Sequence, residues 1–112
     1  MADQADTPAD RLDLLHRRLE RDPDDPACLM ALGEEYARLG QDDRALAHLD
    51  LLTAVQPESA HAWMQKAICQ HRTRDLDGAR RSIEAAAEAA SATDDHDCMD
   101  AVRAVAARLE GE

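Results

Sequence analysis

Aromatic residues are nearly absent from this chain, which has one Trp, one Tyr and no Phe among 112 residues. Since 45% of the residues are hydrophobic, the core must be built from alanine and aliphatic side chains. The alternation of β-branched and polar residues that marks a half-buried strand is also missing, so no strand is expected. These absences predict an all-α protein, and its length allows a single domain.

Positive charge and long apolar runs are scarce as well. Lys and Arg number 13 against 24 Asp and Glu, and the formal net charge of −11 argues against binding to nucleic-acid phosphates or an anionic membrane. No apolar stretch approaches the roughly 18 residues of a membrane span, and the first residues lack a signal-peptide pattern. The sequence therefore predicts an acidic, cytoplasmic protein. The Asp-rich and Arg-rich composition also suits a salt-rich cytoplasm or a high-GC genome.

Motifs for catalysis, cofactors and metals are missing too. The chain has no Gly-x-Ser-x-Gly, no phosphate-binding glycine loop and no His-Glu-x-x-His, so no enzyme activity and no cofactor are expected. The spacing of Cys28, Cys69 and Cys98 fits no zinc site and indicates reduced thiols, with Cys69 buried and the other two more exposed. Residues 94–98 combine carboxylates, an imidazole and a thiol, but an Asp-rich helix N-terminus explains them better than a metal site.

Turn-forming clusters of Pro, Gly and Asp recur at regular intervals and separate stretches of strong helix formers. Within a stretch, apolar residues such as Leu12, Leu15 and Leu19 recur at helical spacing. Connections of about three to five residues make neighbouring helices antiparallel. About six helices are predicted, near residues 8–21, 27–39, 43–55, 60–73, 76–90 and 95–110.

A constant period of 34 residues relates these helices to one another. It separates Pro23 from Pro57 and spaces Leu15, Leu49 and Ile83. Paired helices with such a period are the signature of a solenoid. The positions that carry the repeat are Leu29, Leu32, Gly33, Tyr36, Ala45, Leu49, Pro57, Trp63, Ala79 and Ile83.

The first copy of this repeat resembles the tetratricopeptide repeat family. The family pattern is Trp, two residues, Leu-Gly, two residues, Tyr, then Ala, three residues, Phe, then Pro. Here Leu29 and Leu49 replace the aromatic residues, and the other positions match. Gly33 lets the two helices approach, and Ala45 is the small residue where they cross.

The second copy is more divergent, with Lys66-Ala67 in place of Leu-Gly and Arg74 in place of the turn glycine. In the last helix, Asp97 and Asp100 occupy positions expected in the core, which is typical of a capping helix. The resemblance implies a right-handed superhelical α-α solenoid of antiparallel helix pairs. Its expected parts are a disordered tail (1–7), a half-repeat (8–25), two repeats (26–59 and 60–93) and a capping helix (94–110).

The resemblance also implies a function, since the first helix of each pair in this family lines a concave groove that holds a peptide or a segment of a partner. We therefore expect a non-catalytic adaptor or scaffold. A clamp for the carboxylate of a chaperone tail is not expected, because Glu34 would repel it. Glu34 and Glu35 favour a basic partner, and Arg38 and Arg72 could anchor a carboxylate or carbonyl. The predicted groove residues are Met30, Glu34, Arg38, His61, Met64, Gln65, Ile68, His71 and Arg72.

Two alternatives remain open at this stage. The leucine-rich first helix at an open end suits a self-assembling module, such as a homodimer. The low pI near 4.7 and the Met-lined groove suit a small bacterial secretion chaperone. The starting Met1 and the Asp-rich last helix favour a complete small protein over part of a longer array.

Overall fold

The computed structural model describes residues 7–111, and this range contains helices and no β-strand. The predicted helix ranges agree with the structure to within two residues. The expected disordered tail lies outside the described residues except for Thr7, which caps the first helix. The helices are α1 (Pro8–Arg21), α2 (Pro26–Arg38), α3 (Asp42–Val55), α4 (Ala60–Arg72), α5 (Leu76–Ala92) and α6 (His96–Glu110).

Short polar side chains set where most of the helices begin. Asp25, Ser59, Asp75 and Asp95 each accept a hydrogen bond from a backbone N–H in the first turn of the helix that follows. These N–H groups have no partner within the helix, so the side chains fix its start. Local hydrogen bonds thus mark where these helices begin.

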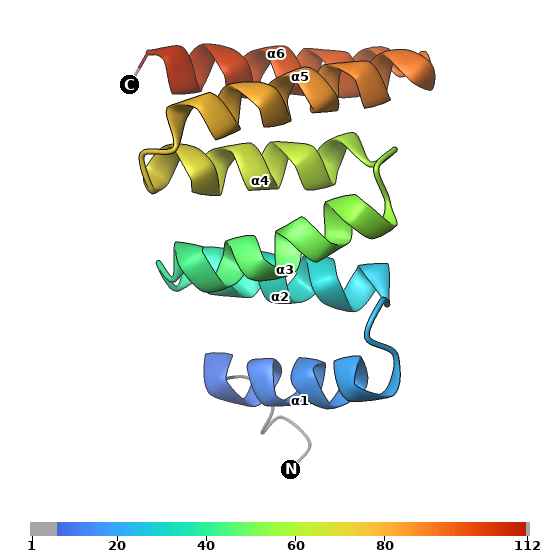
Figure 1. Ribbon diagram of the computed structural model, residues 1–112, viewed down its shortest axis with the longest axis vertical. Coiled ribbons are helices and arrows are strands. Elements are labelled where there is room, and N and C mark those ends of the chain that lie inside the picture. The colour runs from blue at the N-terminus through green and yellow to red at the C-terminus, as the bar shows by residue number, and fades with distance from the viewer. Residues whose placement is uncertain (1–6, 112) are drawn as a thin grey trace.

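The helices lie across the long axis of the molecule and stack along it as antiparallel rods, with α1 and α6 at opposite ends of the stack (Figure 1). The hairpins α2–α3 and α4–α5 form the two complete repeats, and α6 packs on α4 and α5. The first helices of successive repeats, α2, α4 and α6, contact one another in turn. The result is an all-α solenoid of 43 × 29 × 23 Å.

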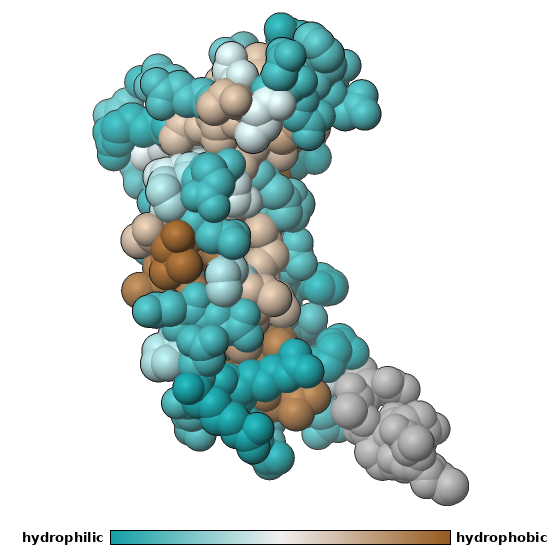
Figure 2. Space-filling model, turned by 90° about the vertical axis from the view of Figure 1, so that its right-hand side faces the viewer, coloured by the Kyte–Doolittle hydropathy of each residue, from teal (hydrophilic) through white to brown (hydrophobic). Residues whose placement is uncertain are grey.

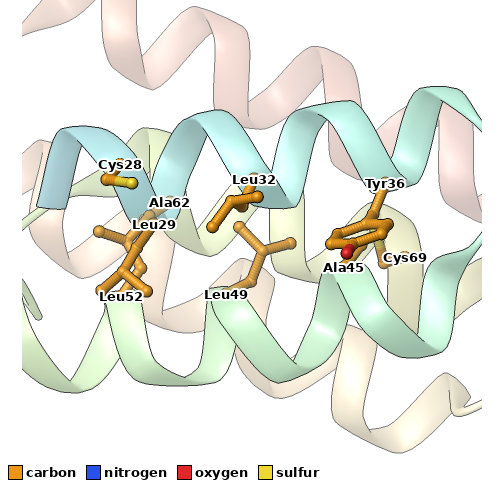
Figure 3. Packing of buried hydrophobic residues seen from close by; sticks show 9 residues of the cluster. All are labelled: Cys28, Leu29, Leu32, Tyr36, Ala45, Leu49, Leu52, Ala62 and Cys69. Atoms are coloured by element: carbon orange, nitrogen blue, oxygen red, sulfur yellow. The ribbon is translucent and has the colours of Figure 1, made fainter. Parts of the chain in front are cut away.

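The first core lies mainly between α2 and α3, and Figure 3 shows its side chains interleaved. Leu29, Leu32 and Leu49 are fully buried. A Cβ atom added at Gly33 would lie 2.7 Å from Cδ2 of Leu49, closer than two carbon atoms can pack. A side chain at this position would displace Leu49, so glycine favours the close approach of α2 and α3, as the repeat pattern predicts.

The second core, between α4, α5 and α6, is built largely from alanine. Ala60, Ala86 and Ala90 are buried in it together with Met64 and Val102. Small side chains bury less apolar area each, so they stabilise the fold less than the leucines of the first core. The core of the more divergent second repeat thus consists mainly of small side chains.

Of the expectations about burial, the one for Cys28 is wrong. Cys28 is only 2% exposed, because α1 covers it and its thiol donates to the carbonyl oxygen of Leu15 at 3.0 Å. Asp97 and Asp100 are exposed and lie outside the core. The α6 residue that is buried is Val102, because within residues 7–111 α6 packs only on α4 and α5.

Replacing Gly33 with Ala is expected to lower the free energy of unfolding by about 1–3 kcal/mol, because the new methyl group overlaps the Leu49 side chain. Urea denaturation followed by circular dichroism measures this change. Gly111→Ala is the control, since a Cβ there has no neighbour closer than 3.5 Å. Equal stability of the two variants would contradict the close approach.

Arg74→Gly is expected to raise the free energy of unfolding by about 0.5–1 kcal/mol. Arg74 has φ +70°, a left-handed conformation that costs a side-chain-bearing residue about 1–2 kcal/mol and costs glycine nothing. The same substitution at Arg81, inside α5, should instead lower stability by about 1 kcal/mol. A loss of stability in both variants, measured by thermal unfolding, would contradict the prediction.

Candidate binding groove

The predicted groove residues lie on α2 and α4, which pack against each other. Glu34 and His61 join the two helices, with 3.2 Å between Oε2 of Glu34 and Nε2 of His61. Their side chains remain 40% and 55% exposed. Residues 27 apart in sequence are thus brought together on an accessible surface.

Apolar and amide side chains flank this pair at helical spacing. Met30 lies one turn before Glu34, and Gln65 and Ile68 lie one and two turns after His61. All three are half-buried, so each presents part of its surface. Met64, by contrast, is only 7% exposed and packs in the second core, where it supports α4 instead of offering a contact.

Arg72 is held by its own chain. Its guanidinium binds the Asp42 carboxylate through Nη2 at 2.6 Å and Nε at 3.1 Å, and donates to the carbonyl oxygen of Ala37 at 3.4 Å. The hydrogen bond to Asp42 raises the pKa of Arg72. Arg72 therefore ties the end of α4 to the start of α3, and a ligand carboxylate would have to compete with Asp42.

Glu35 faces α1 instead of a partner, contrary to expectation. It is 4% exposed, and its carboxylate lies 3.2 Å from Arg11 and 3.3 Å from Arg38. The two guanidinium groups compensate the cost of burying the charge. The 34-residue period could have indicated this burial. Glu35 occupies the same position of its repeat as Cys69, which is buried in the next repeat.

Sequence reasoning missed a cluster of rings where α1, α2 and α3 meet. Tyr36 stacks on His48 with 5.5 Å between ring centroids, and its hydroxyl lies 2.8 Å from Nε2 of His16. Nδ1 of His48 donates to the carbonyl oxygen of Arg44. The cluster attaches α1 to α2 and α3. This contact matters for α1, because none of the residues of α1 is fully buried.

His71, also predicted for the groove, is half-buried at the end of α4. It lines a hollow of about 350 Å³ between α5 and the end of α6. Its lining includes apolar residues such as Leu76 and Ile83, and also Arg74 and Arg80. His71 is therefore separated from the Glu34–His61 pair and belongs to the C-terminal end of the solenoid.

Other kinds of site find little support in residues 7–111. No three His, Cys, Asp or Glu side chains come close enough together there to hold a metal ion. Every helix in that range is too short or too polar to cross a bilayer.

Cys69 makes the stability of the fold depend on pH. Burial, followed by the negative charge of Asp42, raises the pKa of its thiol from 9.0 to about 11. Between pH 9 and 11 the unfolded chain loses this proton while the folded chain keeps it, so the free energy of unfolding falls as pH rises. Urea unfolding between pH 8.5 and 10.5 should show a shallower decline in Cys69→Ala. Identical slopes would contradict this assignment.

Comparisons with known proteins agree with this architecture. A family model described as a tetratricopeptide repeat matches residues 26–69, and no curated protein sequence matches the chain significantly. The first such domain of Spaghetti (RPAP3), solved with the HSP90 peptide SRMEEVD, superposes with a TM-score of 0.74 at 16% identity, over 92% of this chain and 80% of that one. The tetratricopeptide repeat domain of Sgt2 from Aspergillus fumigatus superposes with a TM-score of 0.75 at 24% identity. This match covers 92% of this chain and 68% of the Sgt2 chain. The matched model identifies residues 26–69 as similar to a tetratricopeptide repeat, and the chain as a whole shares the fold of tetratricopeptide repeat domains.

Proposed function

We propose that this chain is a non-catalytic interaction module that binds an extended segment of a partner protein along α2 and α4. One observation carries the proposal: the half-exposed Glu34–His61 pair joins these helices, and the same two helices carry the half-buried Met30 and Ile68. Such a surface offers apolar contact and one carboxylate to a ligand. Methionine is well suited to this, because its flexible side chain adapts to different partners.

The partner segment carries Lys or Arg. Among the predicted groove residues, Glu34 supplies the only carboxylate, while Arg38 and Arg72 are engaged by Glu35 and Asp42. A cationic side chain at Glu34 would form a charge-assisted hydrogen bond. The net charge of −11 also accelerates encounter with basic segments.

The groove sets the length and affinity of the segment. Adjacent helices pack about 8–10 Å apart, so α2, α4 and the next first helix, α6, together span roughly 20 Å. At about 3.3 Å per extended residue, this length holds about six residues. So small a contact gives affinity in the micromolar range.

The preference of this groove should differ from that of the RPAP3 domain, which was solved with the HSP90 peptide SRMEEVD. That peptide brings several carboxylates, and Glu34 would repel them at short range. Discrimination between basic and acidic peptides therefore tests the proposal directly.

Fluorescence anisotropy with labelled heptapeptides provides the test. Peptides with Leu or Met at alternate positions and one central Lys should bind with micromolar Kd, while SRMEEVD should bind at least about tenfold more weakly. Glu34→Lys should weaken binding of the Lys peptides by about tenfold or more, since it replaces attraction with repulsion.

Glu84→Lys is the matched control, because Glu84 is exposed on α5 and the change in net charge is the same. This variant should retain most of the affinity. Equal losses in the two variants would show that overall charge alone drives binding. Tighter binding of SRMEEVD than of the Lys peptides would overturn the proposed preference.

A further inference from the structure

The two ends of the solenoid are complementary halves of one repeat. By the 34-residue period, α1 corresponds to α3 and α5, the second helices of their repeats, and it packs on α2 with no first helix before it in the part of the chain that the structure describes. The last helix, α6, corresponds to the first helices α2 and α4, and no second helix follows it within residues 7–111. We propose that α1 of one copy docks on α6 of a second copy, so that together they complete a third repeat.

The contacts within the two existing repeats define the register of this pairing. Tyr36 of α2 stacks on His48 of α3. One period later, Ser82 of α5 donates to Oε1 of Gln70 in α4 at 2.6 Å. One further period places Ala104 of α6 opposite Leu14 of the second copy. Ala104 is exposed, and Leu14 is 48% exposed, so the pairing covers an apolar side chain that the single chain leaves in water.

The same register pairs opposite charges at positions that are apolar in the other repeats. Leu29 and Leu52 lie side by side in the first core (Figure 3), and Trp63 and Ala86 occupy these positions in the second core. In the third pair, the corresponding residues are Asp97 of α6 and Arg18 of the second copy, both exposed in the single chain. A carboxylate at this core position is thus matched by a guanidinium.

The next turn repeats this match. Ala60 and Ala89, both in the second core, correspond to Asp94 and to Arg21 of the second copy. Because paired helices run antiparallel, the basic end of α1 meets the acidic start of α6.

The opposite ends of the two helices are complementary as well. Asp10 near the start of α1 would meet the end of α6, where Arg108 lies. By the 34-residue period, Arg11 occupies the position of Ala45 and Ala79, the small residues where the paired helices of the other repeats cross. Its guanidinium is turned toward Glu35 of its own chain.

This contact joins different surfaces of the two copies, so each added copy presents a new free α6. Such an interface extends the solenoid head to tail instead of closing at a dimer. The net charge of −11 per copy opposes assembly in dilute salt. At about 0.15 M salt the Debye length is about 8 Å, which screens repulsion between distant charges more than the direct ion pairs.

Sedimentation velocity at about 0.15 M salt, with the protein at 10 μM to 1 mM, tests the proposal. The weight-average mass should rise with concentration past that of a dimer. Arg18→Asp and Asp97→Arg each place like charges at the contact, so each variant alone should remain a monomer over this range. An equimolar mixture should assemble again, because every contact in an alternating chain then pairs Asp with Arg.

Arg81→Asp is the matched control, since Arg81 is exposed on α5 and the change in net charge equals that of Arg18→Asp. It should assemble like the unmodified chain, and circular dichroism should show equal helicity in all variants. A monomer at every concentration would overturn the proposal. So would a dimer that does not grow, or assembly that persists in both single variants.

Discussion

The close approach of α2 and α3 at Gly33 is the constraint on which the rest of the structure depends. Leu49 fills the space that a Cβ atom would occupy, and this contact fixes the distance at which the two helices cross. Because the chain repeats every 34 residues, Ala67 and Ile83 stand at the same places in the second hairpin, and Ala67 is fully buried there. One small residue per repeat thus aligns the first helices, and their alignment creates the surface proposed for binding.

Much of the fold could be predicted from the sequence, because capping residues and the apolar period act locally. The helix bounds and the role of Gly33 follow from such signals. Long-range polar partners could not be predicted this way. The burial of Glu35 depends on Arg11, 24 residues away, and the engagement of Arg72 depends on Asp42, 30 residues away. Cys28 is buried only because α1 folds over it.

The candidate site residues fall into two groups. Some are held by other residues of the same chain, and others keep surface that a ligand can reach. Arg38 and Arg72 looked like anchors for a ligand, but Glu35 and Asp42 hold them. Met64 looked like a contact residue, but it belongs to the second core. Glu34 and His61 keep accessible surface although they contact each other. The proposed preference for basic segments therefore depends on the charge that remains exposed after the fold has paired the others.

The most direct test of this account is to map the binding surface by two-dimensional ¹H–¹⁵N NMR. The unlabelled heptapeptide with a central Lys would be titrated into the ¹⁵N-labelled protein. The account predicts that the shift changes centre on Met30, Glu34, His61, Gln65 and Ile68, while the exposed face of α3 around Leu51 stays unchanged. Shift changes confined to α3 and α5, or none at millimolar peptide, would contradict it.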